Sequence, residues 1–398
     1  MVNVAEASSI VLNHLCDPAV ETLSFHLAVN RVLAETVKAD RDLPPCDRVT
    51  MDGIAIQYGS WEQGRRDYVI EGVQAAGAAR KGLRNSDSCL EVMTGAIMPE
   101  AADSIVPYEH IEIKDRTATI KEKVSKGQNI HIQGQDAKKG STLLERGMLL
   151  GPAEIAVLAA VGKKSVNVFA FPLAAVISSG DELVEIEDQP GIHQVRRSNS
   201  YAIKAAMETI GWGATLYHLP DDKERMVASM KQIADKYKVI ILSGGVSKGK
   251  FDYVPAVLEE IGVRKHFHRV NQRPGKPFWF GVSDKAVTVF ALPGNPVSTY
   301  MCFYKYIRPW IFKSMKVEQA PSSAVLAKDF KGPQGLTYFL QVNVRADHGR
   351  LIAYPDPGGG SGDFANLKNV SGFLELPEDR SSFSAGEVFP YISFRNFY

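Results

Sequence analysis

The chain has 398 residues, of which 45% are hydrophobic and 23% charged, and 46 basic against 45 acidic residues leave a net charge of +1. This length suits roughly two to four domains, and the balanced charge disfavours generic nucleic-acid binding, which usually needs a basic excess. No apolar run reaches membrane-spanning length, and the N-terminus lacks a basic segment followed by a signal-peptide core. The four scattered cysteines form no CxxC pair, so we expect a cytoplasmic protein without a disulfide framework.

The first part of the chain divides into a helical and a β-like segment. Apolar residues at roughly helical spacing, beginning with Val20 and Leu23, predict helices between residues 4 and 40, before two prolines forbid continuation. From 48 to 147, short apolar runs broken by glycine predict strands. A further helix is predicted over 151–162, with proline early and glycine late.

Strands and helices alternate between residues 171 and 314, the pattern of a parallel α/β domain. Three apolar, β-branched runs each end in a glycine-rich turn: LAAVISSGDE from Leu173, KVIILSGGVSKGKFDY from Lys238 and TVFALPGNPVS from Thr288. The helices predicted in this region carry these boundary residues: Asn199 as an N-cap, Asp221-Asp222 at a start and Gly262 at an end. From 324 to 398 the sequence is β-like again.

The glycine-rich turns carry groups that suit a phosphate-bearing ligand. In parallel sheets ligands bind beyond the carboxyl ends of strands, where glycine lets backbone N–H groups approach an anion. A single such turn is weak evidence, because Asp252 could simply cap its helix and Pro296 could simply begin one. Three turns in one domain favour ligand binding over turn formation alone.

One further loop, Arg273-Pro274-Gly275-Lys276-Pro277, holds two cations that could bind phosphate or another oxyanion. A solvated hairpin turn is the alternative. The chain contains no GxxxxGK[ST], HExxH or GxSxG motif, and no GxGxxG follows a strand. His266 and His268 could face one side of a strand as metal ligands, but without a third ligand an ordinary structural role is favoured.

Taken in order, these segments resemble the MoeA-type molybdopterin molybdenumtransferases, which are related to the gephyrin E domain. The resemblance covers nearly the whole chain through LPPCDRVTMDGIAI, VMTGAIMPEAADSIV, IHIQGQDAKKGSTLLERGMLLGPAEIAVLAAVG, AVISSGDELVE, PDDKE, LSGGVSKGKFDY, RPGKP and LPGNPVS. It implies an α/β multidomain protein with a central three-layer molybdopterin-binding domain, a β-rich N-terminal insertion and a small C-terminal β-barrel-like domain. The implied boundaries are 1–47 with 136–170 (linker and helical domain), 48–135 (β-rich), 171–315 (molybdopterin-binding, mostly parallel sheet) and 320–398 (C-terminal).

The resemblance also implies a reaction, in which molybdate enters adenylylated molybdopterin and AMP leaves with the help of Mg²⁺, giving molybdenum cofactor. Members of the family form homodimers in which the N-terminal domains of one subunit complete the cleft of the other. Molybdopterin adenylyltransferase and molybdoenzymes are candidate protein partners, whereas no nucleic acid or membrane is expected. Three alternatives stay open: tungstate as substrate, a non-catalytic scaffold of the same fold, and another enzyme built on the same α/β module.

By motif position, the implied catalytic residues are Asp52, Asp136, Asp252 and Lys276, and the implied metal ligands are Asp181 and Asp252. The implied substrate-binding residues are Thr94, Ser179, Gly180, Asp181, Glu182, Asp221, Asp222, Ser243, Gly244, Gly245, Arg273, Pro277, Pro293, Gly294, Asn295, Ser298 and Ser361. The motifs leave open which of Asp221 and Asp222 is functional. The chain departs from the family pattern at Arg273, which replaces a lysine, and at 338–341, where many members carry an arginine.

Overall fold

The computed structural model describes residues 1–247 and 252–395, which divide into two compact units. Unit 1 consists of Met1–Ala34, Gly147–Gly151 and Ser165–Tyr398, and unit 2 consists of Glu35–Arg146 and Pro152–Lys164. Residues 248–251 of the second glycine-rich turn and residues 396–398 of the predicted C-terminal domain lie outside the described residues. Within the described ranges, no helix is both long enough and apolar enough to cross a membrane.

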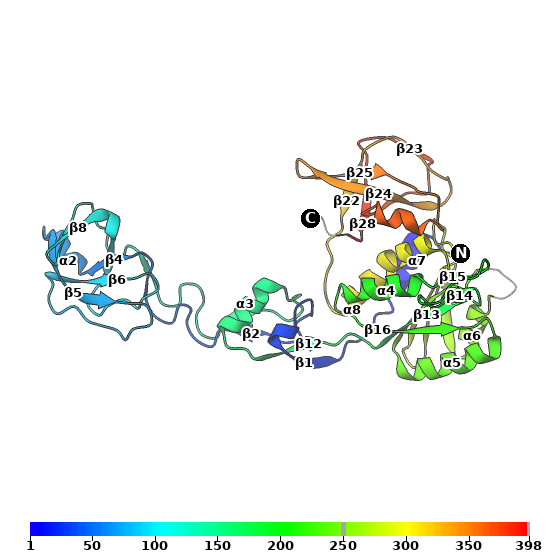
Figure 1. The fold of residues 1–398 in the computed structure, drawn as a ribbon, viewed down its shortest axis with the longest axis horizontal. Helices are drawn as coiled ribbons and strands as arrows, with labels where there is room; N and C mark the ends of the chain where they lie inside the picture. Colours follow the sequence, from blue (N-terminus) through cyan, green and yellow to red (C-terminus); the bar gives the residue numbers. More distant parts are fainter. Residues whose placement is uncertain (248–251, 396–398) are drawn as a thin grey trace. The chain divides into compact units, whose positions relative to one another are not determined.

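Unit 1 is built around a six-stranded sheet (Figure 1). In spatial order its strands are β16 (Ala214–Leu219), β13 (Ala174–Ser179), β17 (Val239–Ser243), β21 (Thr288–Leu292), β20 (Trp279–Ser283) and β18 (Val263–His268). The first four are parallel and the last two are antiparallel to their neighbours. The three apolar runs with glycine-rich turns are therefore the adjacent strands β13, β17 and β21, as the sequence predicts, and their carboxyl ends share one edge.

Helices pack on both faces of this sheet, and α4 and α5 lie on opposite sides of it in Figure 1. Side chains alternate along a strand, so Ala174 and Val176 of β13 join one hydrophobic cluster while Ala175 and Ile177 join the other. The first face carries α1 (Val4–Leu12), α4 (Asn199–Glu208), α7 (Pro296–Cys302), the π-helical turn η3 (Phe303–Ile307) and α8 (Arg308–Ser314). The second face carries α5 (Lys223–Lys236) and α6 (Val254–Glu260).

The C-terminal part of unit 1 forms a closed five-stranded barrel, which confirms the β-barrel-like prediction. Its strands are β24 (Thr337–Asp347), β25 (Arg350–Pro355), β22 (Ser323–Leu326), β28 (Val388–Ser393) and β26 (Gly372–Leu376), and pairing of β26 with β24 closes the barrel. Smaller elements here are η4 (Phe364–Lys368), β23 (Phe330–Lys331) and β27 (Ser382–Phe383). The short strand β19 (Gln272–Arg273) pairs in parallel with β24, which ties the loop that carries Lys276 to the barrel.

The helices predicted between residues 4 and 40 are wrong beyond the first. Helix α1 ends at Leu12, whereas β1 (Val20–Ser24) pairs antiparallel with β12 (Ser165–Phe169) and continues into a 3₁₀ turn, η1 (Phe25–Leu27). The partner strand lies more than a hundred residues away in the sequence. Local apolar spacing could not reveal it, because strand formation depends on cross-strand packing.

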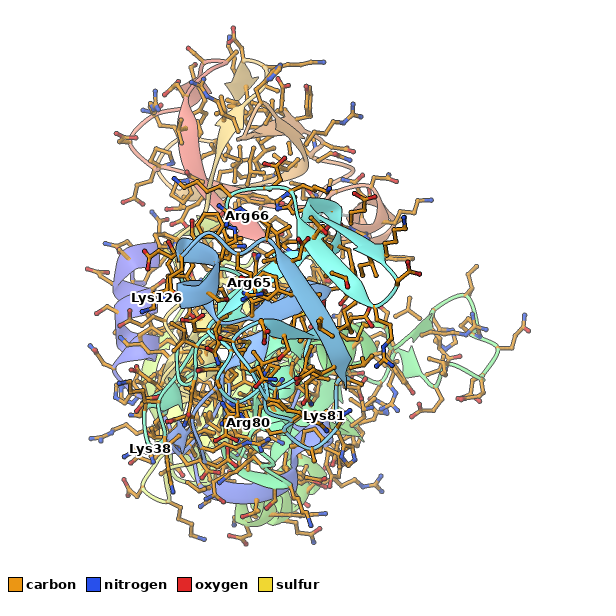
Figure 2. All side chains as sticks on the ribbon, turned by 90° about the vertical axis from the view of Figure 1, so that its left-hand side faces the viewer. Lys38, Arg65, Arg66, Arg80, Lys81 and Lys126 are labelled. Atoms are coloured by element: carbon orange, nitrogen blue, oxygen red, sulfur yellow. The ribbon has the colours of Figure 1, made fainter. Side chains whose placement is uncertain are left out.

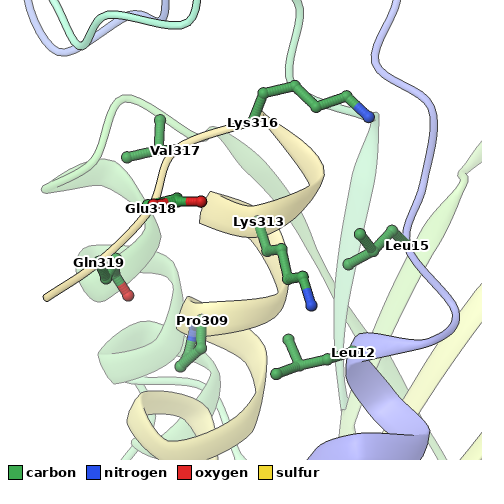
Figure 3. A pocket seen from close by; sticks show the side chains of 8 residues that line it. All are labelled: Leu12, Leu15, Pro309, Lys313, Lys316, Val317, Glu318 and Gln319. Carbon is green, nitrogen blue, oxygen red and sulfur yellow. The ribbon is translucent and has the colours of Figure 1, made fainter. Parts of the chain in front are cut away.

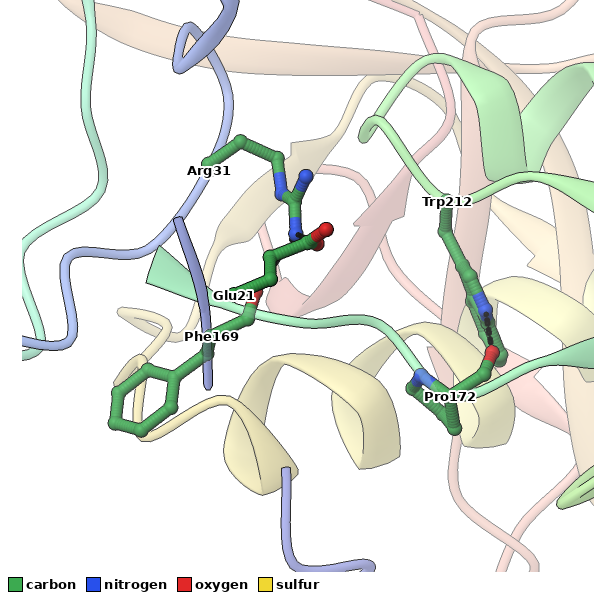
Figure 4. Close-up of polar contacts among 5 residues, drawn as sticks. All are labelled: Glu21, Arg31, Phe169, Pro172 and Trp212. Carbon is green, nitrogen blue, oxygen red and sulfur yellow. Dashed lines mark hydrogen bonds and ion pairs between the residues drawn. The ribbon is translucent and has the colours of Figure 1, made fainter. Parts of the chain in front are cut away.

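Polar contacts hold the segments beside this ladder in place (Figure 4). Arg31 forms an ion pair with Glu21 of β1 and donates a hydrogen bond to the Phe169 carbonyl oxygen at 2.9 Å. Nearby in the chain, the Trp212 indole N–H donates to the Pro172 carbonyl oxygen at 2.8 Å. These bonds satisfy backbone carbonyls where the chain leaves β12 and enters the central sheet.

Unit 2 is a second six-stranded sheet, in agreement with the short apolar runs of its sequence. Its spatial order is β7 (Ser104–Pro107), β4 (Gly53–Ile56), β6 (Ser88–Val92), β5 (Asp67–Gln74), β9 (Thr117–Ile120) and β8 (Ile111–Lys114). The remaining elements are β2 (Val37–Lys38), β3 (Arg48–Val49), α2 (Tyr58–Glu62), η2 (Tyr108–His110), β10 (Ile130–His131), β11 (Thr142–Leu144) and α3 (Pro152–Ala160). Figure 2 labels exposed basic residues of this unit, and the exposed carboxylate residue Asp67 directly follows one of them, Arg66, in the chain.

Candidate functional site

The carboxyl ends of β13, β17 and β21 approach one another too closely for side chains on the connecting backbone. Gly244 has a φ of +103°, and a Cβ on it would lie 2.4 Å from the Ser179 carbonyl oxygen. The Gly244 N–H donates to the Leu292 carbonyl oxygen at 3.2 Å, which joins the second turn to the end of the third strand. Glycine is therefore required here by both conformation and space.

A cavity of about 380 Å³ opens at this edge, and we call it the carboxylate cavity. Three acidic side chains line it, from Glu182, Asp221 and Asp252. Its other lining residues are Ser179, Gly180, Gly244, Gly245, Val246, Ser247, Pro277, Pro293 and Gly294. The Ser179 hydroxyl donates to Asp221 Oδ1 at 3.1 Å, so this carboxylate is held in place by the end of β13.

The structure distinguishes the two neighbouring aspartates that the sequence left open. Asp222 is the N-cap of α5, where its Oδ1 accepts the Arg225 N–H at 2.9 Å, whereas Asp221 lines the cavity. The implied metal ligand Asp181 accepts the Asp221 N–H at 3.0 Å and is absent from the lining, which contains its neighbour Glu182 instead. Within the described part of the chain, no group of three or more His, Cys, Asp or Glu side chains is arranged to hold a metal ion by itself.

A second cavity of about 340 Å³ adjoins the first, and we call it the cation pocket. The basic side chains of Arg273 and Lys276 line it together with the hydroxyl groups of Ser298 and Ser361. Its other lining residues are Ser247, Gln272, Pro274, Gly275, Pro277, Pro293, Gly294, Asn295 and Leu336. Ser247, Pro277, Pro293 and Gly294 line both cavities, so the carboxylate cavity and the cation pocket are two parts of one cleft.

The loop after β25 contributes to the cation pocket through two bonds to the start of α7. The Asn295 amide donates to Ser361 Oγ at 2.8 Å, and the Val297 N–H donates to the Ser361 carbonyl oxygen at 3.1 Å. Pro296 is the first residue of α7, as the sequence predicts. The cleft therefore draws its residues from the sheet, from the loop with Lys276 and from the barrel.

Sequence reasoning missed a residue that braces the turns around the cleft. Asn199 is the first helical residue of α4 and not its N-cap, which is Ser198. Its side-chain amide donates to Ser243 Oγ at 2.9 Å and to the Gly294 carbonyl oxygen at 2.7 Å, which connects the second and third turns. The sequence does place an asparagine at the start of this helix, but a helix N-cap explains an asparagine there as well as a structural contact to the turns does.

A third cavity of about 920 Å³ is lined by Asn199 and shares Ser179, Glu182, Gly244 and Gly294 with the carboxylate cavity. Arg197, adjacent to β15 (Val195–Arg196), lines it with its guanidinium paired to Glu185, and β14 (Leu183–Val184) contributes apolar wall. Ser178 lines it too, and its buried hydroxyl has no hydrogen-bond partner in the structure. Ser178 belongs to the strand-end segment that the sequence marks by its hydroxyls and carboxylates, whereas Arg197 does not stand out in the sequence because basic residues are common at such positions.

In unit 2 the structure brings together two of the predicted site residues. Thr94 donates both its backbone N–H (2.6 Å) and its hydroxyl (2.7 Å) to Asp52 Oδ1. These bonds, the backbone one foremost, hold the pKa of the Asp52 carboxyl below its usual value. Asp136 makes a different contact, with its Oδ1 2.8 Å from His131 Nε2.

Two other features of unit 1 contain none of the implied site residues. A cavity of about 630 Å³ lies between the end of α1 and α8, and Figure 3 shows its lining, with Leu12 and Leu15 facing Lys313. His266 packs against His14 with ring centroids 3.9 Å apart, and burial lowers its pKa. His268 Nε2 lies 2.9 Å from the Val246 carbonyl oxygen, so the two histidines have different partners.

Three family models match successive parts of the chain. Residues 2–162 match the MoeA N-terminal region (domains I and II), residues 175–313 match a probable molybdopterin-binding domain, and residues 323–394 match the MoeA C-terminal region (domain IV). Among solved structures, the MoeA protein of Pyrococcus horikoshii OT3 superposes with a TM-score of 0.86 at 26% identity, covering 99% of this chain and 100% of that chain.

Curated relatives agree with these matches over most of their length. The molybdopterin molybdenumtransferase of Synechocystis is 40% identical over 396 residues, which is 98% of this chain and 99% of that protein. The protein of the same name from Bacillus subtilis is 31% identical and covers 92% of this chain and 88% of its own length. The chain therefore belongs to the molybdopterin molybdenumtransferase (MoeA) family.

Proposed function

We propose that this chain is a molybdopterin molybdenumtransferase that inserts molybdate into adenylylated molybdopterin and releases AMP. The observation that carries the proposal is the pair of adjoining cavities of opposite charge at the strand ends. An adenylylated substrate carries phosphate groups, and molybdate is a tetrahedral oxyanion. A cleft that can hold both must supply cations and N–H donors for the oxyanion, and glycine-rich backbone where phosphate approaches.

In this proposal the cation pocket holds the molybdate. Lys276 supplies a compact positive charge and Arg273 a planar fork of N–H donors, and both side chains are exposed to the cleft. Ser298 is buried with its hydroxyl at the pocket wall, where it can donate to an oxyanion. The loop that carries Ser361 completes the wall from the barrel side.

The carboxylate cavity can supply only part of the ligands of a Mg²⁺ ion, and substrate phosphates would have to supply others. Mg²⁺ is typically bound by one or two carboxylates together with substrate phosphates and water, and this cavity offers Glu182, Asp221 and Asp252. This donor set fits the ion, with Asp252 and Asp221 as the residues that would hold it, whereas the Asp181 carboxylate already caps the Asp221 N–H. When bound, Mg²⁺ supplies charge neutralisation for the departing AMP phosphate.

Three finer features are part of the same proposal. The sheet with its two helical faces acts as a three-layer molybdopterin-binding domain, and the active form is a homodimer. Asp52, Thr94 and Asp136 would act from the N-terminal half of a second copy; the exposed, hydrogen-bonded carboxylate of Asp52 supports this role for the first two. The adenylyltransferase that makes the substrate and the molybdoenzymes that take the product are the proposed protein partners.

The test incubates the purified protein with adenylylated molybdopterin, Mg²⁺ and either molybdate or tungstate, and follows AMP release and cofactor formation together. We expect both products with molybdate and neither without Mg²⁺. If both products form with tungstate but not with molybdate, the reaction is as proposed and its oxyanion substrate is tungstate. Absence of both products with either oxyanion would overturn the proposal in favour of a non-catalytic scaffold.

A further inference from the structure

A buried group of hydrogen-bonded side chains begins at Gln272 in the wall of the cation pocket, and the proposed reaction does not use it directly. Gln272 is only 1% exposed, and its side-chain amide donates to the Gly275 carbonyl oxygen at 3.0 Å. The amide oxygen of Gln272 in turn accepts a hydrogen bond from the Tyr306 hydroxyl. Tyr306, which belongs to the π-helical turn η3, is equally buried.

The side chains around Gln272 and Tyr306 are mostly apolar, so the presence of two buried polar side chains there calls for an explanation. The Phe278 ring packs on Tyr306 with centroids 4.9 Å apart, and the buried thiol of Cys302 lies 3.6 Å from the Gln272 amide nitrogen. Burial raises the pKa of Tyr306 well above its usual value, which keeps the hydroxyl protonated as a donor. Apolar side chains could replace the Tyr306 hydroxyl and its Gln272 acceptor at little cost in stability, since replacing both partners of a buried hydrogen bond is often nearly neutral. The Gly275 carbonyl is the one backbone group that would then lose its donor.

The last hydrogen bond of this series is made to the Gly275 carbonyl, on the backbone of the loop that carries Arg273 and Lys276. Gln272 and Gly275 are buried while Arg273 and Lys276 are exposed, so the loop shows one polar face to the cleft and anchors the other inside. Its ends are joined by the Val270 N–H, which donates to the Lys276 carbonyl oxygen at 3.0 Å. Gly275 has a φ of +90°, and a Cβ there would lie 2.8 Å from Cys302 Sγ, so the loop has no room to settle inward.

We propose that Gln272 and Tyr306 are positioning residues that fix the Gly275 carbonyl and thereby the direction of the Lys276 side chain toward the oxyanion. The inference rests on the proposed function, since it takes the cation pocket as the molybdate site. The π-helical turn belongs to the same arrangement. Pro309 lacks the N–H that would donate to the Lys305 carbonyl in a regular helix, and the altered winding precedes it directly, at the segment that carries Tyr306.

The test compares Gln272→Met, Tyr306→Phe and the double variant. Gln272→Met leaves the Tyr306 hydroxyl and the Gly275 carbonyl oxygen without a partner, and Tyr306→Phe leaves the Gln272 amide oxygen without its donor, so each should lower the unfolding midpoint. The double change removes the hydroxyl as well as the amide, and its midpoint should lie above that of Gln272→Met, with only the Gly275 carbonyl unpaired. A positioning role predicts that the KM for molybdate stays raised about tenfold in all three variants, equivalent to ~1.4 kcal/mol of lost binding. The KM for adenylylated molybdopterin should stay within about twofold of the parent protein.

Tyr237→Phe is the matched control, because it removes another buried hydroxyl, one that pairs with Tyr217 at 3.0 Å beside β16 on the opposite edge of the sheet. It should leave the KM for molybdate unchanged. If the KM for molybdate in the double variant equals that of the parent protein, the hydrogen bonds of Gln272 and Tyr306 are structural only and the inference is wrong. Lys276→Ala separates this outcome from failure of the proposed function, since an unchanged molybdate KM in that variant would instead remove molybdate from the cation pocket.

Discussion

The carboxylate cavity and the cation pocket share four lining residues and have similar volumes, about 380 and 340 Å³, yet they carry opposite charges. In the first, Asp221 is held by the hydroxyl of Ser179 at a strand end. In the second, Lys276 is exposed and its direction depends on the backbone of its loop. The difference shows how one cleft can keep an oxyanion apart from a phosphate-bound cation, since each side repels what the other attracts.

The largest effects are expected when one charged side chain is removed from each of the two cavities. Lys276→Ala and Asp252→Ala should each reduce cofactor formation about 100-fold or more, the scale of losing a group that stabilises developing or bound charge. Thermal unfolding should change little, because Lys276 is exposed and Asp252 is half-exposed. Lys231→Ala on the exposed side of α5 is the control. Undiminished cofactor synthesis in either site variant would contradict the assignment of its cavity.

The close approach of backbone at the carboxylate cavity can be tested through Gly244. Gly244→Ala introduces a Cβ 2.4 Å from the Ser179 carbonyl oxygen at a φ of +103°, and we expect a loss of about 2 kcal/mol or more in the free energy of unfolding. Gly349→Ala is the matched control, with a φ of +79° but no atom within 4 Å of the new Cβ. Chemical denaturation should show a smaller loss there, about 1 kcal/mol. Equal losses would mean that conformation matters and close approach does not.

Asp221 and Asp222 allow the role of a cavity carboxylate to be separated from that of a helix cap. Asp222→Ala removes the N-cap of α5 and should lower stability by about 1 kcal/mol with activity retained. Asp221→Ala should have the reverse profile, with stability kept and AMP release slowed about tenfold at limiting Mg²⁺. Thermal unfolding and Mg²⁺ titrations of both variants measure the contrast, and matching profiles for the two would refute it.

The smallest expected effect concerns unit 2 and pH. The lowered pKa of Asp52 contributes stability that is fully present above the ordinary aspartate pKa and is lost as the pH falls through the lowered, folded-state pKa. Thr94→Val removes the hydroxyl donor but keeps the backbone N–H, which is the larger cause of the shift. The Asp52 pKa should therefore rise only part of the way to its usual value, as measured by NMR titration. A pKa that does not move would show that the hydroxyl plays no part.

The sequence by itself determined the α/β region and its ligand-binding edge. The alternation of apolar runs with glycine-rich turns predicted β13, β17 and β21 as strands of a parallel sheet, because buried parallel strands are continuous apolar runs. The structure adds that the three strands are neighbours. It also predicted the start of α7 at Pro296 and a helix after Asp222. The prediction failed at β1, whose partner strand begins at Ser165 and is invisible to local periodicity.

Only the tertiary structure decided which side chains share a cavity. Asp221 and Asp222 are chemically identical neighbours, and the start of α5 alone makes one a helix cap and leaves the other at the cavity wall. Asn199 likewise had the composition of an N-cap, yet its amide reaches the second and third turns. Gln272 and Tyr306 lie 34 residues apart and meet only because β19 and η3 pack together. Motif spacing follows the chain, whereas hydrogen bonds across a cleft depend on how distant segments pack.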